Sequence, residues 1–176
     1  MKVIEQEIHS LKNSISEMWA LVHQQLYNAG EAMLTGDKEL AYKVISRERR
    51  VNAFELKIDS DCEDIIALYA PVAIDLRFVL AMYKINTNLE RLGDFAESIA
   101  RFAGNLPEGE PIDPQLVKET RVEEMLSELL SMISLTKEAF EKESSEIASR
   151  IFLKDNLIDE INHNSTAIIA KYIEEH

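Results

Sequence analysis

Residues 73–102 read AIDLRFVLAMYKINTNLERLGDFAESIARF, and this stretch is the clearest indication of the architecture. Apolar residues recur along it at alternating intervals of three and four positions: Met82, Ile85, Leu89, Leu92, Ala96 and Ile99. This heptad spacing predicts a single amphipathic helix, with those side chains forming a seam that faces the core of a helical bundle.

Similar spacing of apolar residues predicts further helices on both sides of this one. They extend over about residues 4–34, 38–69, 115–143 and 146–174. Gly36 and Asp37 are typical of a helix end followed by the N-cap of the next helix. Pro71 predicts that the second helix stops at Tyr69, because the residue before a proline avoids the α conformation. No stretch alternates like a β-strand, so the sequence predicts an all-α protein.

The two halves of the sequence resemble each other. Displacing the sequence by 107 residues aligns Met18 with Met125 and Val44 with Ile151, and residue classes match more often than identities do. Three of the four prolines lie in the segment 107–114, which we interpret as a Pro/Gly linker. We therefore predict an up-down helical bundle of two three-helix repeats, residues 1–106 and 115–176.

The second repeat is predicted to contain two helices, because the counterpart of Pro71 would fall just past His176. We expect either that the natural protein is longer or that a partner supplies the missing helix, and we favour the former. A bundle without that helix exposes apolar seams, which dimerisation would cover.

Composition and charge exclude several classes of function. The chain has 176 residues, of which 46% are hydrophobic, and its net charge is −13. A field of that sign disfavours nucleic acids and anionic membranes and leaves metal ions or basic protein surfaces as partners. Cys62 is the only cysteine, which excludes an internal disulfide and a thiolate zinc site. With neither a signal peptide nor an apolar run that spans a membrane, the sequence predicts a soluble intracellular protein.

Acidic strips are the candidate binding features. At 100° per residue, Glu48 and Asn52 share one strip with Glu55 and Asp59 on the second helix, about 90° from its apolar seam. The fifth predicted helix carries Asp155 and Asp159, followed by Asn162 and Thr166, at the same offset.

The third helix carries Glu90 and Asp94, four residues apart, with Gly93 between them. The two carboxylates repel one another, and the glycine weakens the helix. A bridging cation would offset the repulsion, whereas the alternative is a solvated acidic face with Gly93 serving close packing. Oxygen ligands of this kind suit iron, manganese, magnesium or calcium.

The chain resembles the PhoU family of bacterial and archaeal phosphate-signalling proteins. The resemblance runs through nearly the whole chain and rests on these motifs: Glu48–Asn52, Pro71–Arg77, Lys84–Ile85, Asn88–Ala96 and Lys154–Asp159. It implies two three-helix repeats with multinuclear clusters of iron or zinc on the outer faces. The ligands that it implies are these residues: Glu48, Asn52, Glu90, Asp94, Asp155 and Asp159.

The resemblance also implies a function without catalysis. PhoU-like proteins are cytoplasmic, dimerise, and restrain both the phosphate ABC transporter and the histidine kinase that controls phosphate-starvation genes. The expected partners are therefore the transporter ATPase, the sensor kinase and a second copy of the chain. Two departures affect the metal sites: the family usually has Asp at Glu48, and the second Glu-Arg-x-Gly-Asp motif is absent. Only the first repeat is expected to form a full cluster.

Two rival hypotheses remain. Residues 160–163 contain one Glu-x-x-His step, of which di-iron carboxylate enzymes use two, and such an enzyme needs carboxylates that face the core. A metal-free helical adaptor would instead use the acidic strips to dock onto a basic protein surface. We assign no catalytic residue.

Overall fold

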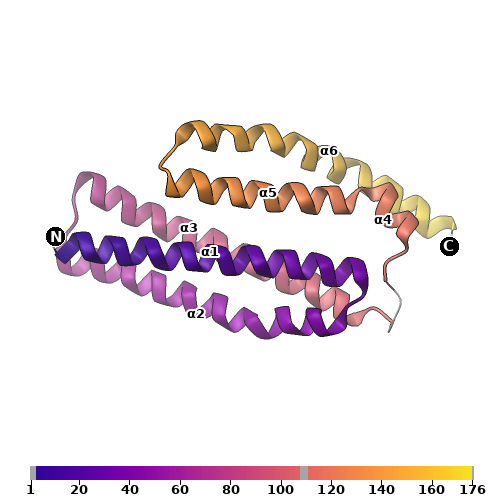
Figure 1. Cartoon of the computed structure of the whole chain (residues 1–176), viewed down its shortest axis with the longest axis horizontal. Coiled ribbons are helices and arrows are strands. Elements are labelled where there is room, and N and C mark those ends of the chain that lie inside the picture. Colours follow the sequence, from indigo (N-terminus) through magenta and orange to yellow (C-terminus); the bar gives the residue numbers. More distant parts are fainter. Residues whose placement is uncertain (1–2, 108–110, 176) are drawn as a thin grey trace.

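The computed structural model describes residues 3–107 and 111–175, and these residues form helices without a strand (Figure 1). The helices are α1 (Val3–Thr35), α2 (Lys38–Tyr69), α3 (Ala73–Asn105), α4 (Pro114–Thr120), α5 (Val122–Glu141) and α6 (Ser145–Glu175). The predicted all-α bundle is confirmed. The division into two repeats with a linker at 107–114 stays a prediction, and residues 108–110 of that linker lie outside the described residues.

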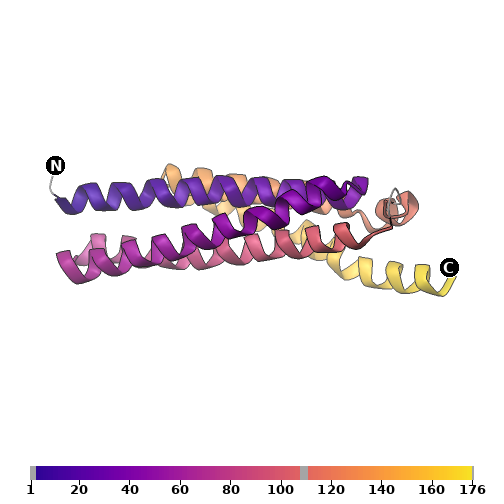
Figure 2. The same cartoon turned by 90° about the horizontal axis from the view of Figure 1, so that it is seen from below.

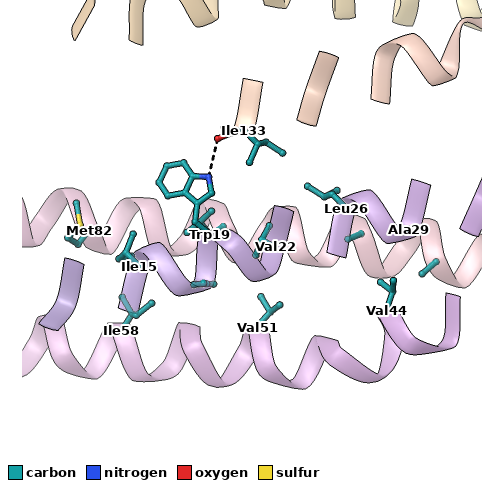
Figure 3. Packing of buried hydrophobic residues seen from close by; sticks show 14 of the residues in the cluster. Ile15, Trp19, Val22, Leu26, Ala29, Val44, Val51, Ile58, Met82 and Ile133 are labelled. Carbon is teal, nitrogen blue, oxygen red and sulfur yellow. Dashed lines mark hydrogen bonds between the residues drawn. The ribbon is translucent and has the colours of Figure 1, made fainter. Parts of the chain in front are cut away.

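Helices α1, α2 and α3 run side by side along the long axis of the molecule (Figures 1 and 2). Each packs against the other two, and α5 packs against α1 and α6. The core between the first three helices consists of fully buried aliphatic side chains, several of which Figure 3 shows, including Ile15, Val22, Val51, Ile58 and Met82.

The helix ends follow the residues that predicted them. Gly36 has a φ of 72°, and the side chain of Asp37 accepts a hydrogen bond from the Leu40 backbone N–H at 2.9 Å. Ala70 takes the left-handed conformation directly before Pro71 and ends α2. Asp113 caps α4 by accepting from the Gln115 N–H at 2.7 Å, with Pro114 in the first turn.

The single helix predicted over 115–143 is wrong, because the chain breaks at Arg121 into α4 and α5. Arg121 has a φ of 55°, which costs an L-residue about 1 kcal/mol. Its guanidinium donates to Glu124 on α5 and to Glu160 on α6, at 2.7 and 2.8 Å. No glycine or proline marks this position, so local sequence signals do not reveal the break.

The α5–α6 hairpin is attached to the three-helix bundle through α1. The Trp19 indole N–H donates to the Ile133 carbonyl of α5 at 3.2 Å (Figure 3). The Trp19 ring stacks on Phe140 at 5.8 Å between centroids, and Lys12 pairs with Glu143 at 3.1 Å. In α6, by contrast, Ile161 is the buried residue among 31 described positions.

Helix α3 is rotated relative to the predicted seam. Met82, Leu89 and Ala96 are buried as expected, but Ile85, Leu92 and Ile99 lie half-buried at the edge of the core. Small and polar residues take their place against α1 and α2: Asn86, Gly93, Ala100 and Ala103. Across the described ranges 3–107 and 111–175, no helix is long and apolar enough to cross a membrane.

Candidate functional site

A glycine allows α2 and α3 to approach closely at the middle of their interface. A Cβ atom built on Gly93 would lie 2.8 Å from the Cγ1 of Val51, closer than real Cβ contacts. Val51 is completely buried and β-branched, so its side chain has little freedom to move. The close approach requires glycine at position 93 and brings the acidic strip of α2 against that of α3.

Glu48 is the unusual residue of this interface. Its side chain is only 6% exposed, and neither carboxylate oxygen has a hydrogen-bond partner within the described residues. The pKa of Glu48 is raised from its ordinary value of 4.5 to about 7, mainly because burial disfavours the charged carboxylate and also because of the nearby negative charges of Asp94, Glu97 and Glu90. A carboxylate in this position is costly unless a proton or a cation neutralises it.

The facing carboxylates belong to α3. Desolvation raises the pKa of Glu90, and the charge of Asp94, the charge of Glu55 and a hydrogen bond with Asp94 add to this, while Arg91 opposes it. Glu90 is half-buried, whereas Asp94 is exposed. Exposure therefore increases across the cluster, from the buried Glu48 on α2 through the half-buried Glu90 to the exposed Asp94 on α3, and one side is open to water.

A buried amide holds the two helices in register next to this cluster. Asn86 on α3 is fully buried, and its Nδ2 donates to the Glu55 carbonyl at 2.9 Å and to Asp59 Oδ1 at 2.7 Å. Both acceptors lie on α2, within three turns of Glu48. These hydrogen bonds fix which residues of α2 face the carboxylates of α3.

The structure brings together some of the predicted ligands and separates others. Glu48, Glu90 and Asp94 belong to one α2–α3 cluster, with Asn52 exposed one turn along α2. Asp155 and Asp159 lie exposed on α6, which packs against α4 and α5 and does not join this cluster. Glu48 belongs to the strip about 90° from the apolar seam of α2, and it is nevertheless buried because α3 approaches closely at Gly93.

Sequence reasoning missed Glu97 and the role of Asn86. Glu97 follows Asp94 by three residues and therefore shares its face of the helix, so the spacing was sufficient to include it. Asn86 falls within the apolar pattern, where a polar residue normally needs a specific partner. That requirement pointed to an interhelical hydrogen bond.

The donor set suits a hard cation better than it suits any other group. The unpartnered oxygens of Glu48 are the observation that supports this fit. However, no three His, Cys, Asp or Glu side chains of residues 3–107 and 111–175 are already arranged as a metal site. The carboxylates are near enough to interact electrostatically, and binding would require their side chains to converge.

Comparison with known proteins shows which family the chain resembles. The family model for the PhoU domain matches residues 15–103. A protein of Aquifex aeolicus (strain VF5), named as a homolog of the phosphate-specific transport system accessory protein PhoU, is 33% identical over 171 residues, which cover 96% of this chain and 75% of the relative.

A relative and a solved structure extend the agreement. A Thermotoga maritima protein named as a PhoU homolog of the same transport system is 30% identical over 171 residues, covering 97% of this chain and 72% of its own length. The crystal structure of the phosphate transport system regulatory protein PhoU from Streptococcus pneumoniae matches with a TM-score of 0.86 and 28% identity, covering 98% of this chain and 80% of that one. The chain belongs to the PhoU family.

Proposed function

We propose that this chain regulates phosphate transport as an accessory protein. The observation that carries the proposal is the match over nearly the whole chain to proteins named as phosphate-specific transport accessory or regulatory proteins. The regulation is negative: when phosphate is plentiful, the protein restrains uptake and the expression of phosphate-starvation genes. This role needs no catalysis, in agreement with the names of the relatives.

The protein acts by contact with other proteins in the cytoplasm. Its partners are the ATPase of a phosphate ABC transporter and the histidine kinase that senses phosphate, and it works as a homodimer. A net charge of −13 favours basic partner surfaces over nucleic acid. The exposed acidic strips of α3 and α6 supply the corresponding negative surface.

A cation bound by the α2–α3 cluster orders this surface. Glu48, Glu90 and Asp94 supply carboxylate oxygens and Asn52 an amide oxygen, while iron or zinc is the metal implied by the family resemblance. Asp155 and Asp159 form an incomplete second site on α6. The support for the first site is the buried, unpartnered carboxylate of Glu48.

Complementation tests the regulatory function. The chain is expressed in a bacterial host that lacks its own PhoU and carries a reporter for a phosphate-starvation promoter. We expect reporter expression in high phosphate to fall toward the level of the intact host. A reporter that stays fully active, while the chain is present at normal abundance and is helical after purification, would overturn the proposal.

Elemental analysis tests the metal site separately. The purified wild-type chain should contain iron or zinc in stoichiometric amount, and Glu90→Ala/Asp94→Ala should lose it. Glu63→Ala/Asp64→Ala removes two exposed acids of α2 outside the cluster and serves as the matched control. Absence of metal from the wild-type chain after reconstitution would favour the metal-free adaptor, in which the acidic strips only dock proteins.

A further inference from the structure

The flank of α2 that faces away from the carboxylate cluster carries a row of basic residues, which we call the basic strip. Its members follow one another at alternating intervals of four and three residues: Lys43, Arg47, Arg50, Phe54 and Lys57. At 100° per residue they fall within a sector of about 80°. Glu48 and Glu55, the acids of α2 within this span, lie about 120–140° from the centre of that sector. Helix α2 therefore has a negative flank toward α3 and a positive flank on its other side.

Contacts with α1 show where the basic strip lies. The Nζ of Lys57 donates to the Oγ of Ser14 at 3.1 Å, and the Nε2 of Gln25 donates to the Val44 carbonyl at 2.8 Å. Helix α1 therefore runs antiparallel beside the strip, and helical spacing places Glu17 as the acid on its bordering edge. In Figure 1, α2 lies on the side of the bundle away from the α5–α6 hairpin. The strip thus borders the shallow groove between α1 and α2.

The cations of the strip are largely unpaired. Lys57 pairs with Asp61 at 2.5 Å, but none of Lys43, Arg47 and Arg50 forms an ion pair with any residue that the structure describes. The chain has 32 acidic residues against 19 basic ones, so a surface cation has many acids available to it. The strip is therefore a concentrated positive surface on a protein whose net charge is −13.

Phe54 adds an apolar contact to this positive surface. Its ring is half-buried and packs against the core, and together with Arg50, Ala53 and Lys57 it lines a shallow hollow of about 200 Å³. Sites that enclose a whole small molecule have volumes of roughly 300–1,000 Å³. The hollow is smaller than that, and it fits a single side chain of a partner that lies along the strip.

The spacing of the strip indicates an α-helix as the partner. Side chains on one face of a helix recur at intervals of three and four residues, so a second helix laid along α2 can place an acid opposite each cation. From Lys43 to Lys57 the strip is about 21 Å long, which is about four helical turns. Arg47 and Arg50 can each hold a carboxylate through two N–H donors. A nucleic acid would extend past the strip to the surrounding acids and would leave the hollow at Phe54 unused.

We propose that the basic strip docks an acidic amphipathic helix of a partner protein. In that helix, Asp or Glu recurs at intervals of three and four residues, and one large apolar side chain within the row occupies the hollow beside Phe54. The charges speed association and fix the register, while the apolar side chain excludes water from the contact. The two flanks of α2 then bind groups of opposite charge. This proposal goes beyond the regulatory role and does not depend on it.

A designed peptide tests the proposal. The peptide is a single helix of about 20 residues in which Glu recurs at alternating intervals of three and four residues along one face, with one Leu within that row. A matched peptide has the same composition but distributes its Glu residues around the helix. By fluorescence anisotropy, we expect the first peptide to bind the wild-type chain with a dissociation constant on the order of 10 μM, and the matched peptide to bind about tenfold more weakly.

Two double variants locate the binding surface. Lys43→Gln/Arg50→Gln removes two exposed cations of the strip and should weaken binding of the first peptide about tenfold. Lys118→Gln/Arg150→Gln removes two exposed cations of α4 and α6 and changes the net charge equally, so this control should bind as the wild-type chain does. Replacing the Leu of the peptide by Ala should weaken binding to the wild-type chain about fivefold, because the hollow at Phe54 is left empty.

Several results would overturn the proposal. Equal binding of the two peptides would mean that net charge alone governs the contact, and equal weakening by the two double variants would place the contact elsewhere. A short oligonucleotide that binds as tightly as the first peptide would assign the strip to polyanions in general. Absence of binding at a peptide concentration of about 1 mM would also refute the proposal. Neither phosphate nor its transporter takes part in this binding, so a failure here leaves the complementation result standing.

Discussion

Replacing Glu48 by glutamine is the most informative perturbation of the α2–α3 cluster. Glutamine keeps the shape of the side chain and removes its negative charge. The pKa of Glu48 is raised from 4.5 to about 7, so between these values the folded chain holds a proton that the unfolded chain has released. The stability contributed by the protonated carboxyl is fully present below pH 4.5 and is lost as the pH rises through about 7.

The size of this effect follows from the two pKa values. At 1.36 kcal/mol per pKa unit, the difference between 4.5 and about 7 corresponds to about 3 kcal/mol in the free energy of unfolding. Water at the open side of the cluster, where Asp94 is exposed, screens the charge and reduces the effect to about 2 kcal/mol. Glu48→Gln should therefore gain about 2 kcal/mol relative to the wild-type chain between pH 4.5 and pH 8, or about 4–8 °C in Tm.

Thermal unfolding of the two chains across this pH range, first in chelator, measures the difference. Without metal, Glu48→Gln should have the higher Tm. Addition of a divalent cation at pH 7.5 should raise the Tm of the wild-type chain above that of Glu48→Gln and leave the Tm of Glu48→Gln unchanged. A constant Tm difference from pH 4.5 to 8 would refute the burial argument. An equal effect of the cation on both chains would refute the assignment of Glu48 as a ligand.

Further substitutions test the packing that positions this cluster. Gly93→Ala should lower the free energy of unfolding by about 1–2 kcal/mol in urea titrations, because the cost of overpacking against Val51 exceeds the gain in helix propensity. In a chain that also carries Val51→Ala, the added methyl group has room, so Gly93→Ala should no longer be destabilising. Asn86→Ala should lower the free energy of unfolding by about 1–2 kcal/mol in the same assay, because the hydrogen bonds to Glu55 and Asp59 are lost. The control Asn88→Ala changes an exposed residue of α3 and should alter the free energy of unfolding little. Trp19→Phe should cost about 1 kcal/mol and increase hydrogen exchange in α5, since the hydrogen bond to Ile133 is lost; unchanged exchange there would contradict the role assigned to Trp19.

The sequence predicted the helices well where punctuation is explicit. Gly36, Asp37 and Pro71 act through backbone conformation, which is a local property, and the helix ends they mark agree with the structure. Arg121 is the counterexample. Its left-handed conformation is accompanied by ion pairs to Glu124 and Glu160, and the second of these lies 39 residues away. A break maintained by a distant partner leaves no local signal.

The rotation of α3 has a different cause. This helix carries two neighbouring strips with the same heptad spacing, and one contains the large residues Ile85, Leu92 and Ile99. The other contains Gly93 and Ala96, which permit close contact with α1 and α2. The predicted seam combined residues of both strips, so it placed the centre of the core too close to Ile85, Leu92 and Ile99. Where small residues allow backbones to approach, packing density outweighs the size of individual side chains.

The same close approach explains why the acidic cluster was only partly predicted. Helical spacing groups Glu48 with Asn52 and Glu90 with Asp94, since it depends on the geometry of one helix. The burial of Glu48 depends on the distance between α2 and α3, which Gly93 keeps short, and on the register of the two helices, which the hydrogen bonds of Asn86 fix. The pattern of a single helix contains neither the distance nor the register, so the sequence did not predict that the carboxyl of Glu48 is buried.

Glu48 also lowers the stability of the fold that contains it. Its uncompensated charge opposes folding near neutral pH, and an amide of the same shape in that position would be more stable. The close contact of Gly93 with Val51 maintains this unfavourable site, although an alanine would favour the helix. Residues that reduce stability in this coordinated way are typical of binding sites, where a ligand supplies the missing interaction. The metal proposal therefore rests more on the energetic cost of Glu48 than on the number of acids around it.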